Sequence, residues 1–171
     1  APREVMPLDS LSPEFVTTLL AAARKEFDVT LLDLPPVWNE GMYTALQQSD
    51  VIFLVTQLTV AGIRQARHQL NTIHMQGLAA DVRVVLNRYE KGWGKAVQLK
   101  EAEKALGCPI EHCIPNDYKL VSEALNQGVA LSHIKGRSKV EKAIQAMVEE
   151  TMARLQGQEG QASAIMVAGR A

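Results

Sequence analysis

Polar side chains that could bind a small ligand stand at the ends of three apolar runs in this sequence. Asp33 closes the first run, Asn87 closes another, and Pro115, Asn116 and Asp117 follow a third. The amide of Asn87 can both accept from and donate to the edge of an adenine ring, and backbone groups around 115–117 could close over a base or a ribose. Each of these residues alone is better explained as an ordinary turn residue, whereas the ordered set favours a ligand site.

The elements that position these residues follow from the hydrophobic pattern. Apolar, β-branched runs predict buried strands, and longer amphipathic stretches bounded by Ser, Pro and Gly predict helices. Strands are expected at about 29–33, 51–56, 82–87 and 109–114, and helices at about 13–26, 42–48, 62–76, 97–106, 120–127 and 138–155. Alternating helices and strands predict a parallel sheet with crossover helices on both faces, a three-layer α/β sandwich. Its carboxyl edge is where such sheets bind ligands.

Composition narrows the classes of function. The chain has 171 residues, 47% of them hydrophobic, and a formal net charge of −1. Neutral charge and 5% aromatic residues argue against a nucleic-acid surface, and no apolar run reaches the length of a membrane span. Two cysteines, Cys108 and Cys113, fit a reducing compartment, so we expect a cytoplasmic protein. We expect one domain over 1–156 and a disordered tail over 157–171, where Gly, Gln, Ala and Ser dominate.

Four sequence blocks, in order, resemble the carboxyl-terminal part of the ParA/MinD ATPases. The blocks are D-V-T-L-L-D-L-P, S-D-V-I-F-L-V-T-Q-L-T-V-A-G-I-R-Q-A-R, V-V-L-N-R-Y and C-I-P-N-D-Y-K-L-V-S-E-A-L-N-Q-G-V-A-L. The tryptophan after D-L-P-P and the I-P-N-D-Y-K-L-V run resemble the CpaE/TadZ branch, whose proteins act in pilus assembly and polar localisation. The resemblance implies a P-loop NTPase fold of the SIMIBI, MinD-like kind, and a homodimer that binds ATP and Mg²⁺.

The resemblance also implies roles for individual residues. Asp33 matches the Walker B acid, which lies near Mg²⁺ and can hold it through water, and Pro35 lies in the switch II turn that follows. Asn87 and Arg88 match the N-R pair at the adenine. The loop of Pro115, Asn116 and Asp117 would pack on the base and ribose.

One element of the family pattern has no match in the sequence. The phosphate loop K-G-G-x-G-K-[S/T], whose backbone N–H groups cradle phosphates, does not occur. The stretch 91–96, K-G-W-G-K-A, is one residue short, carries a bulky Trp93 and has Ala96 where Mg²⁺ needs a hydroxyl, so a basic turn explains it better. We therefore expect a fold that is incomplete at its amino-terminal side, and a chain that does not hydrolyse ATP by itself, although the intact protein would be an ATPase.

Other candidate sites are weaker. A metal site at Cys108, His112 and Cys113 is disfavoured because strand alternation sends His112 and Cys113 to opposite faces. His68 and His74 are six residues apart rather than four, and no nucleophile–base set stands out for catalysis. The basic residues Lys135, Arg137, Lys139 and Lys142 predict a solvated face rather than a DNA site. Glutamates on the last helix oppose direct contact with anionic lipid, so we expect membrane contact to be at most indirect.

Three hypotheses for function remain open at this point. The first is a CpaE/TadZ-like ATPase-domain protein that binds ATP and helps to localise and assemble the type IV (Flp/Tad) pilus secretion machinery, at the cell pole near the inner membrane, with pilus proteins as partners. The second is a non-catalytic localisation scaffold with a vestigial nucleotide site. The third is a DNA-partitioning ATPase of the ParA type, which predicts salt-sensitive DNA binding.

Overall fold

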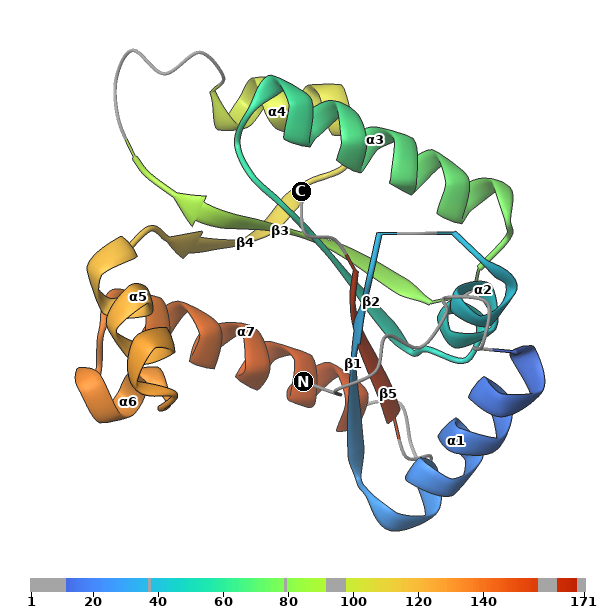
Figure 1. Ribbon diagram of the computed structural model, residues 1–171. Helices are drawn as coiled ribbons and strands as arrows, with labels where there is room; N and C mark the ends of the chain where they lie inside the picture. Colours follow the sequence, from blue (N-terminus) through green and yellow to red (C-terminus); the bar gives the residue numbers. More distant parts are fainter. Residues whose placement is uncertain (1–11, 37, 79, 92–97, 157–162, 169–171) are drawn as a thin grey trace.

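The computed structural model describes residues 12–36, 38–78, 80–91, 98–156 and 163–168, without side-chain detail for the last of these ranges (Figure 1). Helices and strands alternate along most of this chain, as the pattern predicts. The helices are α1 (Pro13–Glu26), α2 (Glu40–Gln47), α3 (Val60–Met75), α4 (Leu99–Leu106), α5 (Tyr118–Gln127), α6 (Leu131–Ile134) and α7 (Lys139–Gln156). The strands are β1 (Val29–Leu34), β2 (Val51–Thr56), β3 (Asp81–Tyr89), β4 (Ile110–Pro115) and β5 (Ser163–Ala168).

Short polar residues and glycines set the helix ends. The Ser12 hydroxyl accepts a hydrogen bond from the Phe15 backbone N–H at 3.2 Å, and Pro13 occupies the first helical position of α1. At the other end of a helix, Gly107 takes a left-handed φ of 75° after α4, a conformation that costs glycine least. The predicted helix boundaries therefore have a local chemical cause.

The strands form one parallel sheet in the order β1-β5-β2-β3-β4. Helices α3 and α4 lie on one face, and α7 lies on the other (Figure 1). Helices α1 and α2 pack on the same face as α3, over Ile52 of β2. The predicted three-layer α/β sandwich with a parallel sheet is confirmed.

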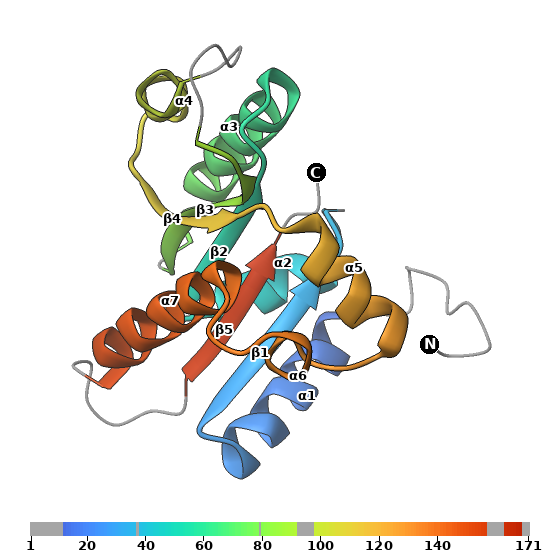
Figure 2. The same cartoon turned by 90° about the vertical axis from the view of Figure 1, so that its left-hand side faces the viewer.

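Strand β5 corrects one expectation of the sequence analysis. Residues 163–168, expected within a disordered tail, instead pair in parallel with β1 on one side and with β2 on the other. Figure 2 shows β5 beside β1. The run A-I-M-V-A is short and is flanked by residues typical of loops, so its pattern is weak. Two neighbouring strands satisfy its backbone hydrogen bonds, which is a tertiary effect that local pattern does not report.

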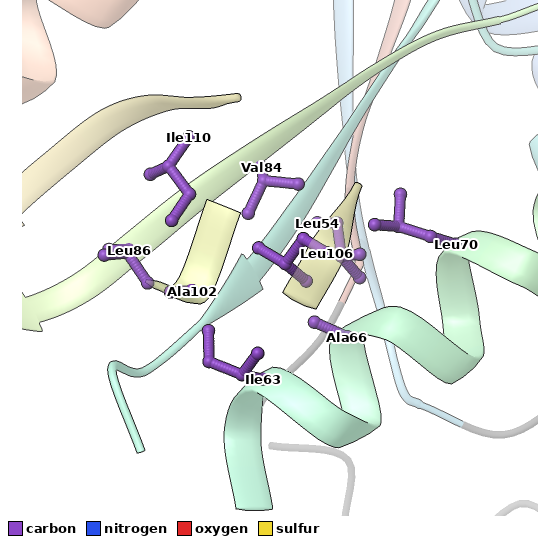
Figure 3. Packing of buried hydrophobic residues seen from close by; sticks show 9 residues of the cluster. All are labelled: Leu54, Ile63, Ala66, Leu70, Val84, Leu86, Ala102, Leu106 and Ile110. Atoms are coloured by element: carbon purple, nitrogen blue, oxygen red, sulfur yellow. The ribbon is translucent and has the colours of Figure 1, made fainter. Parts of the chain in front are cut away.

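The two faces of the sheet have separate cores. Under α3 and α4, side chains of β2, β3 and β4 meet side chains from both helices (Figure 3). Ile63, Ala66 and Leu70 of α3 point toward Leu54 and Val84 of the sheet. On the opposite face, a second core joins β2, β3 and β4 to α7; its buried members are Val51, Phe53, Val85, Ile114, Val140 and Leu155.

Candidate functional site

A cavity of about 630 Å³ opens at the carboxyl edge of β2, β3 and β4. Five of the seven residues that the sequence analysis selects line it: Asn87, Arg88, Pro115, Asn116 and Asp117. They meet there because parallel neighbouring strands end at one edge of a sheet, and α5 begins directly after β4 (Figure 1). The structure brings these five residues together, whereas their role in binding a ligand stays a prediction.

Asn87 and Arg88 shape the carboxyl end of β3. The Asn87 side-chain oxygen accepts a hydrogen bond from the Arg88 backbone N–H at 2.8 Å. Arg88 itself takes a left-handed φ of 54°, uncommon for a residue with a side chain. The pairing of β3 with β4 changes register at this point, between Leu86 and Tyr89. Both side chains are exposed at the rim of the cavity, the place where a bound ligand would meet an amide and a guanidinium.

The loop between β4 and α5 is held by its own side chains. The Asn116 backbone N–H donates to the Tyr89 carbonyl at 2.9 Å, and its side-chain amide donates to a Glu90 carboxylate oxygen at 2.6 Å. Asp117 caps α5 by accepting from the Leu120 N–H at 3.2 Å. This wall of the cavity is therefore prearranged, and the positive end of the α5 dipole lies beside it.

Thr56 is a cavity residue that the sequence analysis missed. It ends β2, is only 3% exposed, and its hydroxyl oxygen has no hydrogen-bond partner among the described residues. Buried hydroxyls normally have a partner, since leaving one unpaired costs roughly 1–3 kcal/mol. The rule that selected Asn87, a polar residue ending an apolar strand, applies equally to Thr56 and would have found it.

Asp33 and Pro35 lie outside this cavity. Asp33 is exposed at the end of β1, which is separated from β2 by β5. Within the described part of the chain, Asp33 belongs to no group of three side chains that could hold a metal ion. Mg²⁺ bound to nucleotides keeps several waters and uses one or two carboxylates, so Asp33 fits at most a single contact, direct or through water.

The weaker candidate sites are the 91–96 stretch and the Cys108–His112–Cys113 group. The stretch Lys91-Gly92-Trp93-Gly94-Lys95-Ala96 falls almost wholly on residues 92–97, outside those that the structure describes. Cys113 packs against the α3–α4 core, whereas the His112 ring contacts Phe53 on the opposite face. The predicted separation of these two side chains is therefore confirmed. Burial raises the pKa of both the Cys108 and the Cys113 thiol, which makes them weak ligands and weak nucleophiles.

The fold of this sheet and its helices is that of the ParA/MinD-like ATPases. A ParA family ATPase from Chlorobium tepidum superimposes with a TM-score of 0.74 at 23% identity, over 84% of this chain and 59% of the other. The cell division ATPase MinD of Pyrococcus furiosus gives 0.67 at 22% identity, over 83% and 59%.

One curated protein is similar in sequence as well. The septum site-determining protein MinD of Helicobacter pylori is 26% identical over 127 residues, which are 69% of this chain and 47% of that protein. No family model matches the chain. These similarities support a relationship to the ParA/MinD-like ATPase superfamily as a whole. The chain spans about half the length of these relatives.

Across the described ranges, no helix combines the length and the apolar character needed to cross a bilayer.

Proposed function

We propose that the cavity at the carboxyl edge binds the adenosine part of ATP, in a protein of the CpaE/TadZ branch of the ParA/MinD-like ATPases. The observation that carries this proposal is the buried Thr56 hydroxyl, which has no hydrogen-bond partner in the described part of the chain and lies in a hollow also lined by Asn87 and the 115–117 loop. A hydroxyl, an amide and backbone groups at one concave edge are the polar set that a nucleoside needs.

The rest of the nucleotide would extend from this cavity along the sheet edge. Arg88 and the amino-terminal end of α5 both favour a negatively charged ligand. Asp33 would make its contact to Mg²⁺ when the phosphates bring the ion. The sequence contains no phosphate loop, so nothing would stabilise the charge that develops on the transferred phosphoryl group. This chain is therefore proposed to bind nucleotide through the base pocket and not to hydrolyse it.

Titration of adenosine and of MgATP into the chain tests the base pocket directly. Calorimetry should give weak binding of both, because most of the contacts would be to the nucleoside, with MgATP modestly tighter because Arg88 and the amino-terminal end of α5 favour its charge. Thr56→Val and Asn87→Ala should each weaken binding by roughly tenfold. Each removes one hydrogen bond to the ligand, and a loss of about 1.4 kcal/mol in binding free energy corresponds to a tenfold change in affinity. The matched control is Asn71→Ala, an exposed asparagine on α3 outside the cavity.

Two outcomes would overturn the base pocket. One is binding that Asn71→Ala reduces as much as Asn87→Ala does. The other is no binding of adenosine to this chain or to the intact protein, which would support the scaffold with a vestigial site.

The place of this protein in the cell is a second part of the proposal. We propose that the intact protein forms a nucleotide-linked homodimer, lies at the cell pole near the inner membrane, and helps to assemble the type IV (Flp/Tad) pilus machinery with pilus proteins as partners. Its support is the D-L-P-P tryptophan and the I-P-N-D-Y-K-L-V run. In a fluorescent fusion of the intact protein, Asp33→Ala should abolish polar foci. Foci that persist would favour the scaffold, and salt-sensitive DNA binding would favour the partitioning ATPase.

A further inference from the structure

Strand β4 carries a bulge near its amino-terminal end, away from the cavity at its carboxyl end. Val84 of β3 pairs with Ile110, but the next residue, Val85, pairs with His112, so Glu111 is the extra residue. In a regular strand, Glu111 and His112 would point to opposite faces. A bulge re-aims side chains, and bulges are common next to functional sites. Here the bulge accounts for both side chains reaching the same region, beside α7.

His112 reaches this region as a buried group with an unused ring nitrogen. Its side chain is 8% exposed, and Nε2 has no hydrogen-bond partner within the described residues. Nε2 lies 3.9 Å from a carboxylate oxygen of Glu150 on α7. The Phe53 ring meets the imidazole edge-on at a centroid distance of 6.4 Å and helps to orient it. A buried imidazole nitrogen without a partner, aimed at a carboxylate, is unusual unless something binds there.

Glu111 completes the group. One ligand atom from each of Glu111, His112 and Glu150 lies within 4.8 Å of the other two. Tetrahedral ligands about 2.0–2.2 Å from a zinc ion lie roughly 3.3–3.6 Å from one another, so the three ligand atoms would have to approach by up to about 1.5 Å. Rotation of the two exposed glutamate side chains can supply this movement, and their carboxylates supply the charge that a divalent cation needs.

We propose that Glu111, His112 and Glu150 bind a divalent transition-metal ion, Zn²⁺ or one with similar preferences. One imidazole nitrogen with two carboxylate oxygens is a ligand set of this class, whereas Mg²⁺ and Ca²⁺ prefer oxygen alone. The ion would tie helix α7 to strand β4 on the face of the sheet opposite α3 and α4 (Figure 1). This site is independent of the nucleotide edge, which lies at the other end of β4.

Two arginines compete with the ion for the carboxylates. Arg154 donates to Glu150 at 2.6 Å and lies 3.9 Å from Glu111, while buried Arg83 lies 3.8 Å from Glu111. Arg154 is half exposed and can move into solvent, and Asp81 holds Arg83 more closely, at 2.7 Å. Metal binding is therefore coupled to release of Arg154.

The test is a Zn²⁺ titration by competition calorimetry, with thermal unfolding as a second readout. Cys108→Ser and Cys113→Ser are built into every variant, because thiolates also bind zinc. The parent should bind one Zn²⁺ and melt at a higher temperature with it, since a ligand of the native state stabilises that state. His112→Asn and Glu150→Gln should each weaken zinc binding by about a hundredfold. Loss of a residue that only orients a metal ligand already costs about 10–100-fold in metal affinity, and loss of a direct ligand should cost at least as much. Arg154→Gln should strengthen binding.

Controls separate a built site from surface binding and from misfolding. His68→Asn, on the exposed side of α3, should leave the affinity unchanged. Glu150 is 44% exposed, so Glu150→Gln is expected to fold even if His112→Asn does not. The proposal is overturned if Glu150→Gln keeps full affinity, if His68→Asn costs as much as His112→Asn, or if Mg²⁺ binds as tightly as Zn²⁺.

Discussion

The face of the sheet under α3 and α4 is filled by aliphatic strand side chains, whereas the face under α7 mixes apolar and polar ones. Leu54, Val84 and Leu86 form the first surface, each at most 1% exposed. On the second, Arg83 is 1% exposed and donates to the buried Thr151, and His112 is buried against Phe53. An aliphatic face is stabilised by burial alone. A buried cation is stable only beside groups that accept its hydrogen bonds and balance its charge. The packing of α7 on this face therefore depends on those particular side chains.

The aliphatic face should show the largest loss of stability on truncation. Leu86→Ala removes a side chain that is 0% exposed, and its cavity should lower the free energy of unfolding by roughly 2–5 kcal/mol. Leu31→Ala, at a position 66% exposed on β1, is the matched control and should cost well under about 1 kcal/mol. Urea unfolding followed by circular dichroism measures both. Equal losses would contradict the arrangement of this core.

The polar face should respond more to losing an acid than to losing its buried cation. Asp81→Ala leaves the Arg83 guanidinium buried, without the carboxylate 2.7 Å away, and should cost roughly 2–4 kcal/mol. Arg83→Met replaces the cation by an apolar chain of similar length and leaves the partly exposed Asp81 to solvent and Arg154, so a cost below about 1.5 kcal/mol is expected. The reverse order in chemical denaturation would refute this account of the α7 face.

Two threonines sharpen the same comparison at a smaller scale. Both Thr151 and Thr72 donate to the carbonyl four residues earlier, at 2.7 and 3.0 Å. Only Thr151 also accepts from Arg83, at 3.3 Å. Thr151→Val should therefore cost about 1 kcal/mol, and Thr72→Val close to nothing. Similar midpoints for both variants would show that the Arg83 contact contributes little.

The smallest effect concerns the thiols on the aliphatic face. Burial raises the pKa of Cys108 and Cys113, with nearby glutamates acting in the same direction and Arg67 opposing it at Cys108. Because the thiolate is the reactive form, both should react with Ellman's reagent several-fold more slowly at pH 8 than in the urea-unfolded chain. The rate should climb as the pH is raised through the folded-state pKa. Rapid reaction of either thiol in the native state at pH 8 would contradict the burial.

Much of the fold follows from local pattern. The strand predicted at 51–56 has those bounds in the structure, and β3 and β4 differ from expectation by one or two residues, because their apolar runs are continuous and bounded by turn residues. The helix α6 and the strand β5 were not predicted. Both are short, and β5 is stabilised by neighbours from distant parts of the chain.

The candidate site could be predicted in part. Residues at the ends of β3 and β4 converge because the topology forces strand ends together, and the alternation of apolar and polar blocks reveals that topology. The sequence pattern did not predict that β5 lies between β1 and β2. For that reason it also did not predict that Asp33, on β1, lies outside the cavity. The group of Glu111, His112 and Glu150 depends on a strand bulge and on the packing of α7. Neither feature can be predicted from hydrophobic periodicity in the sequence.

The place of β5 between β1 and β2 has a consequence for the kinetics of folding. Among the described strands, β1 pairs only with β5, and the register joins Val29 to Ser163, residues near opposite ends of the described chain. Bringing β1 and β5 together closes a long loop of chain, and the conformational entropy is lost before the contacts between the two strands can compensate for it. The helices and the β2-β3-β4 unit can form from local segments, so insertion of β5 is expected to be the slow, late event. Until it occurs, β1 and β2 each present an unpaired backbone edge, the surface through which partly folded chains aggregate.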